Sequence, residues 1–326
     1  MMKRLLQLVL AMSVALPGLS SAAFGQTKAT LKLIVQFKAH DLQGESLIQV
    51  VYSPTSMNFI TAASDGMVKV WEKPDVKKFE FSQEPLAMLF NGRFEPDNTT
   101  LVTAAYNGIA TRWSLKGLKP QRYGPHLSGV TDVEILPAQA GVVTTSDDGS
   151  IRFWSDDGSL VKRVERSGVS RHLALARQRQ LVAVTQDIGA ITLLSINGQV
   201  LQSIHTNEGR LNDIIFSPDE QLLLTTGFDG TIKIWDLEDP LKPAKLKTTI
   251  KASQTGWVNG LALNRSGILA SVADDGKVRL WNLQGQNLAT LQLSNHHLLS
   301  CSFSPNGEKL LVATQDGTIS ELSVQP

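Results

Sequence analysis

The sequence has few of the residues from which disulfides and metal centres are built. One cysteine among 326 residues excludes an intrachain disulfide and a zinc site made of several cysteines. This residue, Cys301, lies on the apolar side of an alternating segment, so we expect it to be a small buried hydrophobe. The 31 Lys and Arg residues nearly balance the 30 Asp and Glu residues, and a net charge of +1 argues against a nucleic-acid partner.

Long hydrophobic runs are missing after the first 23 residues. Residues 3–4 are Lys-Arg, residues 5–16 are mostly apolar, and the small residues 21–23 precede Phe24. This order is typical of a secretory signal peptide, residues 1–23. The alternative is a membrane anchor, but the apolar stretch is shorter than the ~20 residues that a spanning helix needs. We therefore expect an exported bacterial protein, periplasmic or secreted, whose mature chain (residues 24–326) does not insert into a membrane.

Motifs that carry enzymatic chemistry are also absent. The sequence has no phosphate-binding glycine loop, no nucleophile elbow and no HExxH motif. Its Asp-Asp-Gly strings lack the spaced ligands and closing Glu of an EF-hand. The adjacent pair His296-His297 has no nearby carboxylate in sequence and is a weak sign of a metal. The sequence therefore predicts no catalytic residue, no metal site and no cofactor.

What the sequence does contain is a repeat. In seven copies, a turn residue and a glycine precede alternating apolar residues, which end on tryptophan in five of the copies. The marker glycines recur every 40 to 46 residues, at Gly66, Gly108, Gly149, Gly189, Gly230, Gly276 and Gly317. Self-similarity at this period indicates a repeat architecture. The longest interval predicts an insertion at residues 237–245, in an exposed connection between the fifth and sixth units.

Each repeat has the pattern of four short β-strands. In the fifth, residues 211–216 and 222–226 are apolar segments separated by a turn that contains Pro218. The turn Asp229-Gly230 then leads into residues 231–235, which alternate with period two. Because no helical apolar stripe follows residue 23, the sequence predicts an all-β fold.

The motifs Phe216-Ser217-Pro218, Asp229-Gly230 and Trp235-Asp236 of this unit resemble the WD40 repeat. The resemblance extends over residues 29–324. It implies one four-stranded blade per repeat, and hence a single-domain, seven-bladed β-propeller. It also implies that an N-terminal strand, residues 31–37, supplies the outer strand of the last blade and closes the ring.

The same resemblance implies that the repeated aspartates are structural. In WD40 proteins the turn Asp belongs to a hydrogen-bonded set with a His, a Ser or Thr, and the Trp. The matching residues here are His40, Thr61, Asp65 and Trp71; His126, Thr144, Asp148 and Trp154; His205, Thr225, Asp229 and Trp235; Ser271, Asp275 and Trp281; and, in the seventh unit, Asp316. The fourth unit has Ile188, Val184 and Leu194 instead, which predicts a more apolar blade.

WD40 proteins often bind partners on the face formed by two classes of loop. One class contributes the residue before the turn Asp, and the other contributes the residue that begins the innermost strand. These residues are Ser64, Tyr106, Asp147, Asp187, Phe228, Asp274 and Gln315; and Ser46, Met88, Gly129, Val169, Arg210, Trp257 and His297.

Within this face we expect a contact patch on blades 5 and 6, because Arg and Trp are enriched where binding energy concentrates. Its members are Arg210, Phe228, Trp257, Asp274 and His297, with Tyr106 across the face. Trp257 is the best single candidate because it is not a scaffold tryptophan. The alternative is that Trp257 only packs against its neighbouring loop.

These observations favour an exported, non-catalytic scaffold that binds a protein partner through the loop face. Two alternatives remain open: an exported propeller enzyme, or a binder of a small ligand or polysaccharide. The enzyme or small-ligand reading would use the central cavity, and the polymer reading would use the exposed aromatic side chains.

Overall fold

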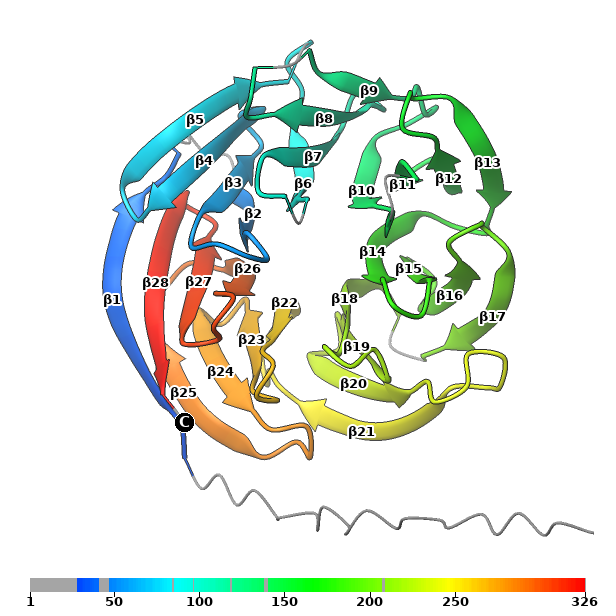
Figure 1. Ribbon diagram of the computed structural model, residues 1–326. Helices are drawn as coiled ribbons and strands as arrows, with labels where there is room; N and C mark the ends of the chain where they lie inside the picture. Colours follow the sequence, from blue (N-terminus) through cyan, green and yellow to red (C-terminus); the bar gives the residue numbers. More distant parts are fainter. Residues whose placement is uncertain are drawn as a thin grey trace, which may run out of the picture.

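Seven four-stranded antiparallel sheets surround a central axis in the computed structural model (Figure 1). The structure describes residues 28–40, 47–83, 85–95, 97–117, 119–137, 140–206 and 209–325, so the predicted signal peptide lies outside the described residues. The expected all-β, seven-bladed propeller is confirmed. In each blade the innermost strand lies at the axis and the outermost strand lies at the rim.

The blades follow one another in chain order. Blade 1 contains β2 (Leu47–Tyr52), β3 (Phe59–Ala63), β4 (Met67–Lys73) and β5 (Val76–Ser82); blade 2 contains β6 (Leu89–Phe94), β7 (Thr100–Ala105), β8 (Ala110–Ser114) and β9 (Gln121–Tyr123); blade 3 contains β10 (Val130–Ile135), β11 (Val142–Ser146), β12 (Ser150–Trp154) and β13 (Leu160–Glu165). Blade 4 contains β14 (Ser170–Ala176), β15 (Leu181–Gln186), β16 (Ala190–Ser195) and β17 (Val200–His205); blade 5 contains β18 (Leu211–Phe216), β19 (Leu222–Gly227), β20 (Thr231–Asp236) and β21 (Lys245–Lys251). Blade 6 contains β22 (Val258–Leu263), β23 (Leu269–Ala273), β24 (Lys277–Trp281) and β25 (Asn287–Gln292); blade 7 contains β26 (Leu298–Phe303), β27 (Lys309–Thr314), β28 (Thr318–Gln325) and β1 (Thr30–Lys38).

The turn between the second and third strands of a blade explains the recurring Asp-Gly pair. The carboxylate of Asp65 accepts the backbone N–H of Met67 at 2.9 Å, and Asp148 and Asp229 make the same bond two residues on. Gly66 has a φ of 77°, a region that side chains disfavour, so glycine is needed here. The sequence thus predicts these turns from local chemistry alone.

The hydrophobic core is divided among the gaps between blades. Each of the seven apolar clusters in the described part of the chain joins two neighbouring blades. The scaffold tryptophans face the preceding blade: Trp154 packs with Tyr123 of blade 2, and Trp235 packs with Leu193 of blade 4. These tryptophans are nearly buried, and truncating such a side chain to Ala costs about 3–5 kcal/mol.

The ring closes as expected. β1 pairs antiparallel with β28 from Thr30 opposite Gln325 to Lys38 opposite Thr318, with a bulge near Ile34. Its Phe37 lies 5.0 Å from the Trp71 ring, centroid to centroid, and joins the core between blades 7 and 1. One strand from the start of the described chain thereby completes the last blade (Figure 1).

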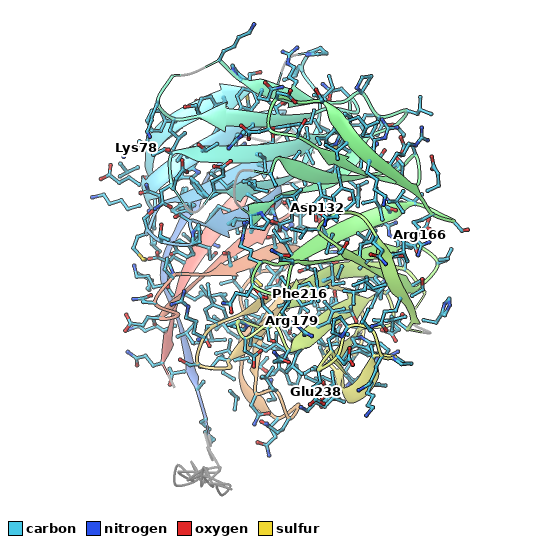
Figure 2. All side chains as sticks on the ribbon, turned by 45° about the vertical axis from the view of Figure 1, so that its right-hand side comes forward. Lys78, Asp132, Arg166, Arg179, Phe216 and Glu238 are labelled. Carbon is cyan, nitrogen blue, oxygen red and sulfur yellow. The ribbon has the colours of Figure 1, made fainter. Side chains whose placement is uncertain are left out.

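The insertion near residues 237–245 is not where the sequence predicts it. It joins β20 to β21 inside blade 5, not blade 5 to blade 6. Arg179 of blade 4 donates hydrogen bonds to the carbonyls of Leu237, at 2.7 Å, and Glu238, at 3.1 Å; Figure 2 labels Arg179 and Glu238. The spacing between the marker glycines gives only the length of a repeat and does not show which of its loops contains the extra residues.

Deleting residues 29–38 should therefore lower the free energy of unfolding sharply, because it opens the ring and exposes the apolar faces of blades 7 and 1. Phe37→Ala alone should cost about 3–5 kcal/mol. The control is Leu33→Ala on the same strand, where the side chain is 43% exposed. Thermal or urea unfolding measures both effects. An unchanged melting temperature in the deletion would contradict closure by β1.

Candidate functional site

The two classes of loop predicted from the sequence meet at one end of the blades, which we call the loop face. In six blades the residue before the turn donates its backbone N–H to the carbonyl of the residue that immediately precedes the innermost strand, at 2.9 to 3.1 Å. The pairs are Tyr106–Met88, Asp147–Gly129, Asp187–Val169, Phe228–Arg210, Asp274–Trp257 and Gln315–His297. Ser46 lies outside the described residues. Residues far apart in sequence are therefore brought together in pairs.

Three side chains of blades 5 and 6 form a layered stack on the loop face. The rings of Phe228 and Trp257 are parallel, 8° apart, with centroids at 3.9 Å. The guanidinium carbon of Arg210 lies 5.0 Å from the centroid of the Phe228 ring. Such contacts hold an aromatic surface in one orientation. Trp257 nevertheless remains 46% exposed, so packing against its neighbour leaves much of it open to solvent.

Polar side chains lie next to the stack on the side that faces blade 7. The carboxylate of Asp274 accepts a hydrogen bond from the Asn259 amide at 2.8 Å and lies 3.3 Å from Nδ1 of His297. Asp274 also accepts the backbone N–H of Trp257 at 3.3 Å, which places the Trp257 backbone directly. The structure thus brings together five of the six predicted patch residues.

The sixth, Tyr106, belongs to a separate apolar group on blade 2. Its ring is 6.0 Å from that of Phe90, centroid to centroid, and it is 61% exposed. Met88 is also exposed on this blade, and Leu127 is exposed in the loop that leads from blade 2 to blade 3. Sequence reasoning missed Phe90 and Leu127, although both lie beside predicted loop-face positions. A β-bulge in the inner strand, between Leu89 and Asn91, places Phe90 outside the simple alternation.

The turn sets are complete in blades 1 and 3. His126 lies 3.1 Å from Asp148 through Nδ1 and 2.8 Å from Thr144 through Nε2, and the Trp154 indole donates to Thr144 at 2.8 Å. His40, with Asp65, Thr61 and Trp71, repeats this arrangement. In blade 6 the Trp281 indole donates to Ser271 at 2.9 Å, while Asp275 pairs with Arg279. In blade 7, Asp316 accepts hydrogen bonds from Thr318.

The assignment of His205 to the set of blade 5 is wrong. His205 is exposed at the end of β17, and the next residue, Thr206, takes the buried position at which His126 lies in blade 3. Thr206 donates its backbone N–H to Gly189, as His126 does to Gly108. A shift of one residue reverses the side of the strand to which a side chain points. Trp235 still donates to Thr225 at 3.2 Å.

Blade 2 keeps only half of the set. The Trp113 indole donates to Thr103 at 2.9 Å, but Gln83 and Asn107 stand where blade 1 has His40 and Asp65. Both amide atoms of Gln83 are buried without a hydrogen-bond partner among the described residues, and so is the hydroxyl of Thr111. Leaving such a group unpaired costs about 1–3 kcal/mol.

The inner strands line a central cavity of about 460 Å³ whose walls include Arg93, Glu134 and Asp213. Burial raises the pKa of Asp132 on β10, which Figure 2 labels, to about 7. Burial likewise raises the pKa of Asp213 to about 6.

Both carboxylates nevertheless have a structural role, because each forms a hydrogen bond to the neighbouring blade. Asp132 accepts the backbone N–H of Leu173 in blade 4 at 2.8 Å, and Asp213 accepts that of Leu261 in blade 6 at 2.8 Å. Cys301 is buried, as predicted, and burial raises the pKa of its thiol.

No cluster of three or more His, Cys, Asp or Glu side chains suited to a metal ion occurs in the described ranges. Those ranges also contain no helix that is long and apolar enough to cross a membrane.

The turn set of blade 3 predicts a dependence of stability on pH. Burial and the nearby Arg152 lower the pKa of His126 to about 4, whereas an unfolded histidine titrates near ~6.5. The unfolded chain therefore binds more protons at this site as pH falls from ~6.5 to ~4, and stability drops. Over this interval the free energy of unfolding of the wild type should fall by up to ~1.4 kcal/mol per pH unit relative to that of His126→Gln. Urea unfolding at a series of pH values measures the difference, and a constant difference would contradict the assignment.

Comparison with known proteins agrees with this architecture. The sequence profile described as "WD domain, G-beta repeat" matches residues 31–72, 119–155, 198–236, 244–282 and 285–320. The two longest of its internal gaps, residues 73–118 and 156–197, contain most of blades 2 and 4, and neither of these blades has a complete turn set.

An uncharacterized WD repeat-containing protein of Synechocystis sp. is 42% identical over 302 residues, which cover 92% of this chain and 88% of that protein. Another WD repeat-containing protein of the same organism is 33% identical over about half of each chain. Telomerase protein component 1 of Mus musculus is 23% identical over 83% of this chain but only 11% of its own length. The chain therefore belongs to the WD40-repeat family.

Proposed function

We propose that the protein is an exported, non-catalytic scaffold that captures a protein partner on the loop face of blades 5 and 6. The observation that carries this proposal is the exposed stack of Arg210, Phe228 and Trp257. Trp and Arg dominate the energetically important positions of protein interfaces. Protein interfaces typically have an aromatic-rich centre and a polar rim, and the stack with its polar neighbours has the same arrangement.

The charge distribution supports a local contact. The net charge of the whole chain is only +1, so its long-range field attracts neither nucleic acid nor a strongly charged protein. Arg210, by contrast, is a local cation without an ion-pair partner among the described residues. Burial and the neighbouring Arg171 lower its pKa. A partner with an acceptor group next to an apolar or aromatic side chain would match the stack.

The non-catalytic reading is supported by the bonding of the acids near the cavity. Glu134 pairs with Arg93 at 3.0 Å, and Asp132 and Asp213 each accept two backbone N–H groups. These groups hold blades together, whereas a general acid or base must be able to exchange its proton with a substrate. The enzyme alternative would require a substrate that displaces these internal bonds.

Trp257→Ala and Arg210→Ala should each weaken partner binding by ~2 kcal/mol or more, about thirtyfold in Kd. Stability should change by no more than ~1.5 kcal/mol, because the side chains are exposed and lose mainly one stacking contact. A pull-down from the exported fraction, followed by titration of the captured protein, measures binding. Leu241→Ala, on the exposed loop between β20 and β21, is the matched control. Equal capture by all variants would contradict the assigned surface.

Export makes a separate prediction. If residues 1–23 are a cleaved signal peptide, the protein recovered from the exported fraction should begin at Phe24. Replacing Lys3 and Arg4 by Glu should reduce export because the positive n-region is lost. Intact-mass measurement of periplasmic or culture-medium protein tests this. A mature protein that keeps Met1 would rule out cleavage.

A further inference from the structure

A second cavity lies at the rim, between blades 1 and 2. It has a volume of about 190 Å³ and is lined by Ser82, Gln83, Thr111, Trp113, Pro120 and Arg122, which together define the blade 2 cavity. An engineered protein cavity of ~150 Å³ binds benzene, a molecule of six heavy atoms. The blade 2 cavity therefore has room for an organic ligand of about that size.

Comparison among the blades explains why a cavity opens here. Two residues before the tryptophan of the third strand, blades 1 and 3 carry Lys69 and Arg152. Their cationic groups donate to loop carbonyls at 2.9 and 2.7 Å. Blades 5 and 6 have Lys233 and Arg279 at this position. Blade 2 has the short side chain of Thr111 instead, so the volume filled by a cation elsewhere is open.

The buried end of the cavity presents hydrogen-bonding groups without partners. Gln83 is 1% exposed, and its Nε2 donor and Oε1 acceptor are both unpaired within the described residues. Thr111 is also 1% exposed, and its hydroxyl likewise has no hydrogen-bond partner among the described residues. In blades 4 and 7 the equivalent hydroxyls of Thr192 and Ser320 each have a side-chain partner at 3.0 Å. A ligand here must therefore both accept and donate hydrogen bonds.

The outer end of the cavity supplies a positive charge. Arg122 lies directly opposite Thr111 in the pairing of β8 with β9, and it is exposed. It has no ion-pair partner in the described part of the chain, and none of the six lining residues is acidic. Arg prefers to bind carboxylates through paired N–H groups.

We propose that the blade 2 cavity binds a small hydroxycarboxylate. The carboxylate accepts hydrogen bonds from the Arg122 guanidinium and from Nε2 of Gln83, and the ligand hydroxyl donates to Oε1 of Gln83. Thr111 completes the polar end, and Trp113 supplies an apolar wall. This site lies on blades 1 and 2 and shares no residue with the stack on blades 5 and 6, so it stands or falls independently of the proposed scaffold function.

The test is titration of the purified mature protein with L-lactate, followed by calorimetry and by the shift in melting temperature. Propionate lacks the hydroxyl and glycerol lacks the charge, so both should bind at least about tenfold more weakly than lactate. Gln83→Met keeps the size of the side chain and removes both hydrogen-bonding atoms. Arg122→Gln removes the charge. Each substitution should weaken lactate binding at least about tenfold.

Arg163→Gln is the matched control, because Arg163 has the same register on the outer strand of blade 3, opposite Arg152. It should leave lactate binding unchanged. Thr111→Arg should abolish binding, because it places a guanidinium in the cavity as blade 3 does. The proposal is overturned if wild-type protein shows no saturable lactate binding up to about 10 mM. Equal binding of lactate, propionate and glycerol, or no effect of Gln83→Met, would equally overturn it.

Discussion

The structure depends on one constraint: a four-stranded blade has two apolar faces, and only neighbouring blades can cover them. Every apolar cluster of the described chain lies between two blades, so no blade has a core of its own. The ring must therefore close, and the pairing of β1 with β28 is the bond that closes it. The backbone N–H groups of Leu173 and Leu261 donate hydrogen bonds to Asp132 and Asp213, and these bonds join blades 3 and 4 and blades 5 and 6 near the axis.

Because of this constraint, the strands and turns that join the blades must keep their geometry, whereas the exposed loops can vary and carry function. The acids around the central cavity are engaged in joining blades, and the turn sets fix the ends of the strands. The loop face has more freedom, because its backbone hydrogen bonds pair the loops without using side chains, and side chains such as Tyr106 and Trp257 are exposed there. Phe228 and Trp257 form a flat stacked surface on this face, and neither residue belongs to a turn set.

Much of the fold can be predicted from the sequence because the blade pattern is local. Asp65 and Gly66 specify their turn through one hydrogen bond and one positive φ, and the alternation up to Trp71 specifies the next strand. His205 could not be placed, since a single-residue shift at the end of β17 exchanged it with Thr206.

The candidate site is less predictable, because it joins residues from different repeats. Repeat alignment makes Phe228 and Trp257 neighbours, but their parallel stacking depends on the heights of two loops from adjacent blades. The blade 2 cavity, with Gln83 and Thr111 in its lining, is harder still to predict. It arises from two departures from the repeat in different parts of the chain, and each looks like ordinary degeneracy when it is read alone.

The strand that closes the ring also imposes an order of events on folding. β1 is synthesised first among the described strands, yet its partner β28 is the last. Until β28 is made, the edge of β1 has no partner in the native fold, and the apolar side chains Leu33 and Ile34 lie on that strand. A contact between the two ends of a chain has a large loop-closure cost and slows folding. Ring closure is therefore a late step, and an incomplete chain exposes an unpaired, aggregation-prone strand at its beginning.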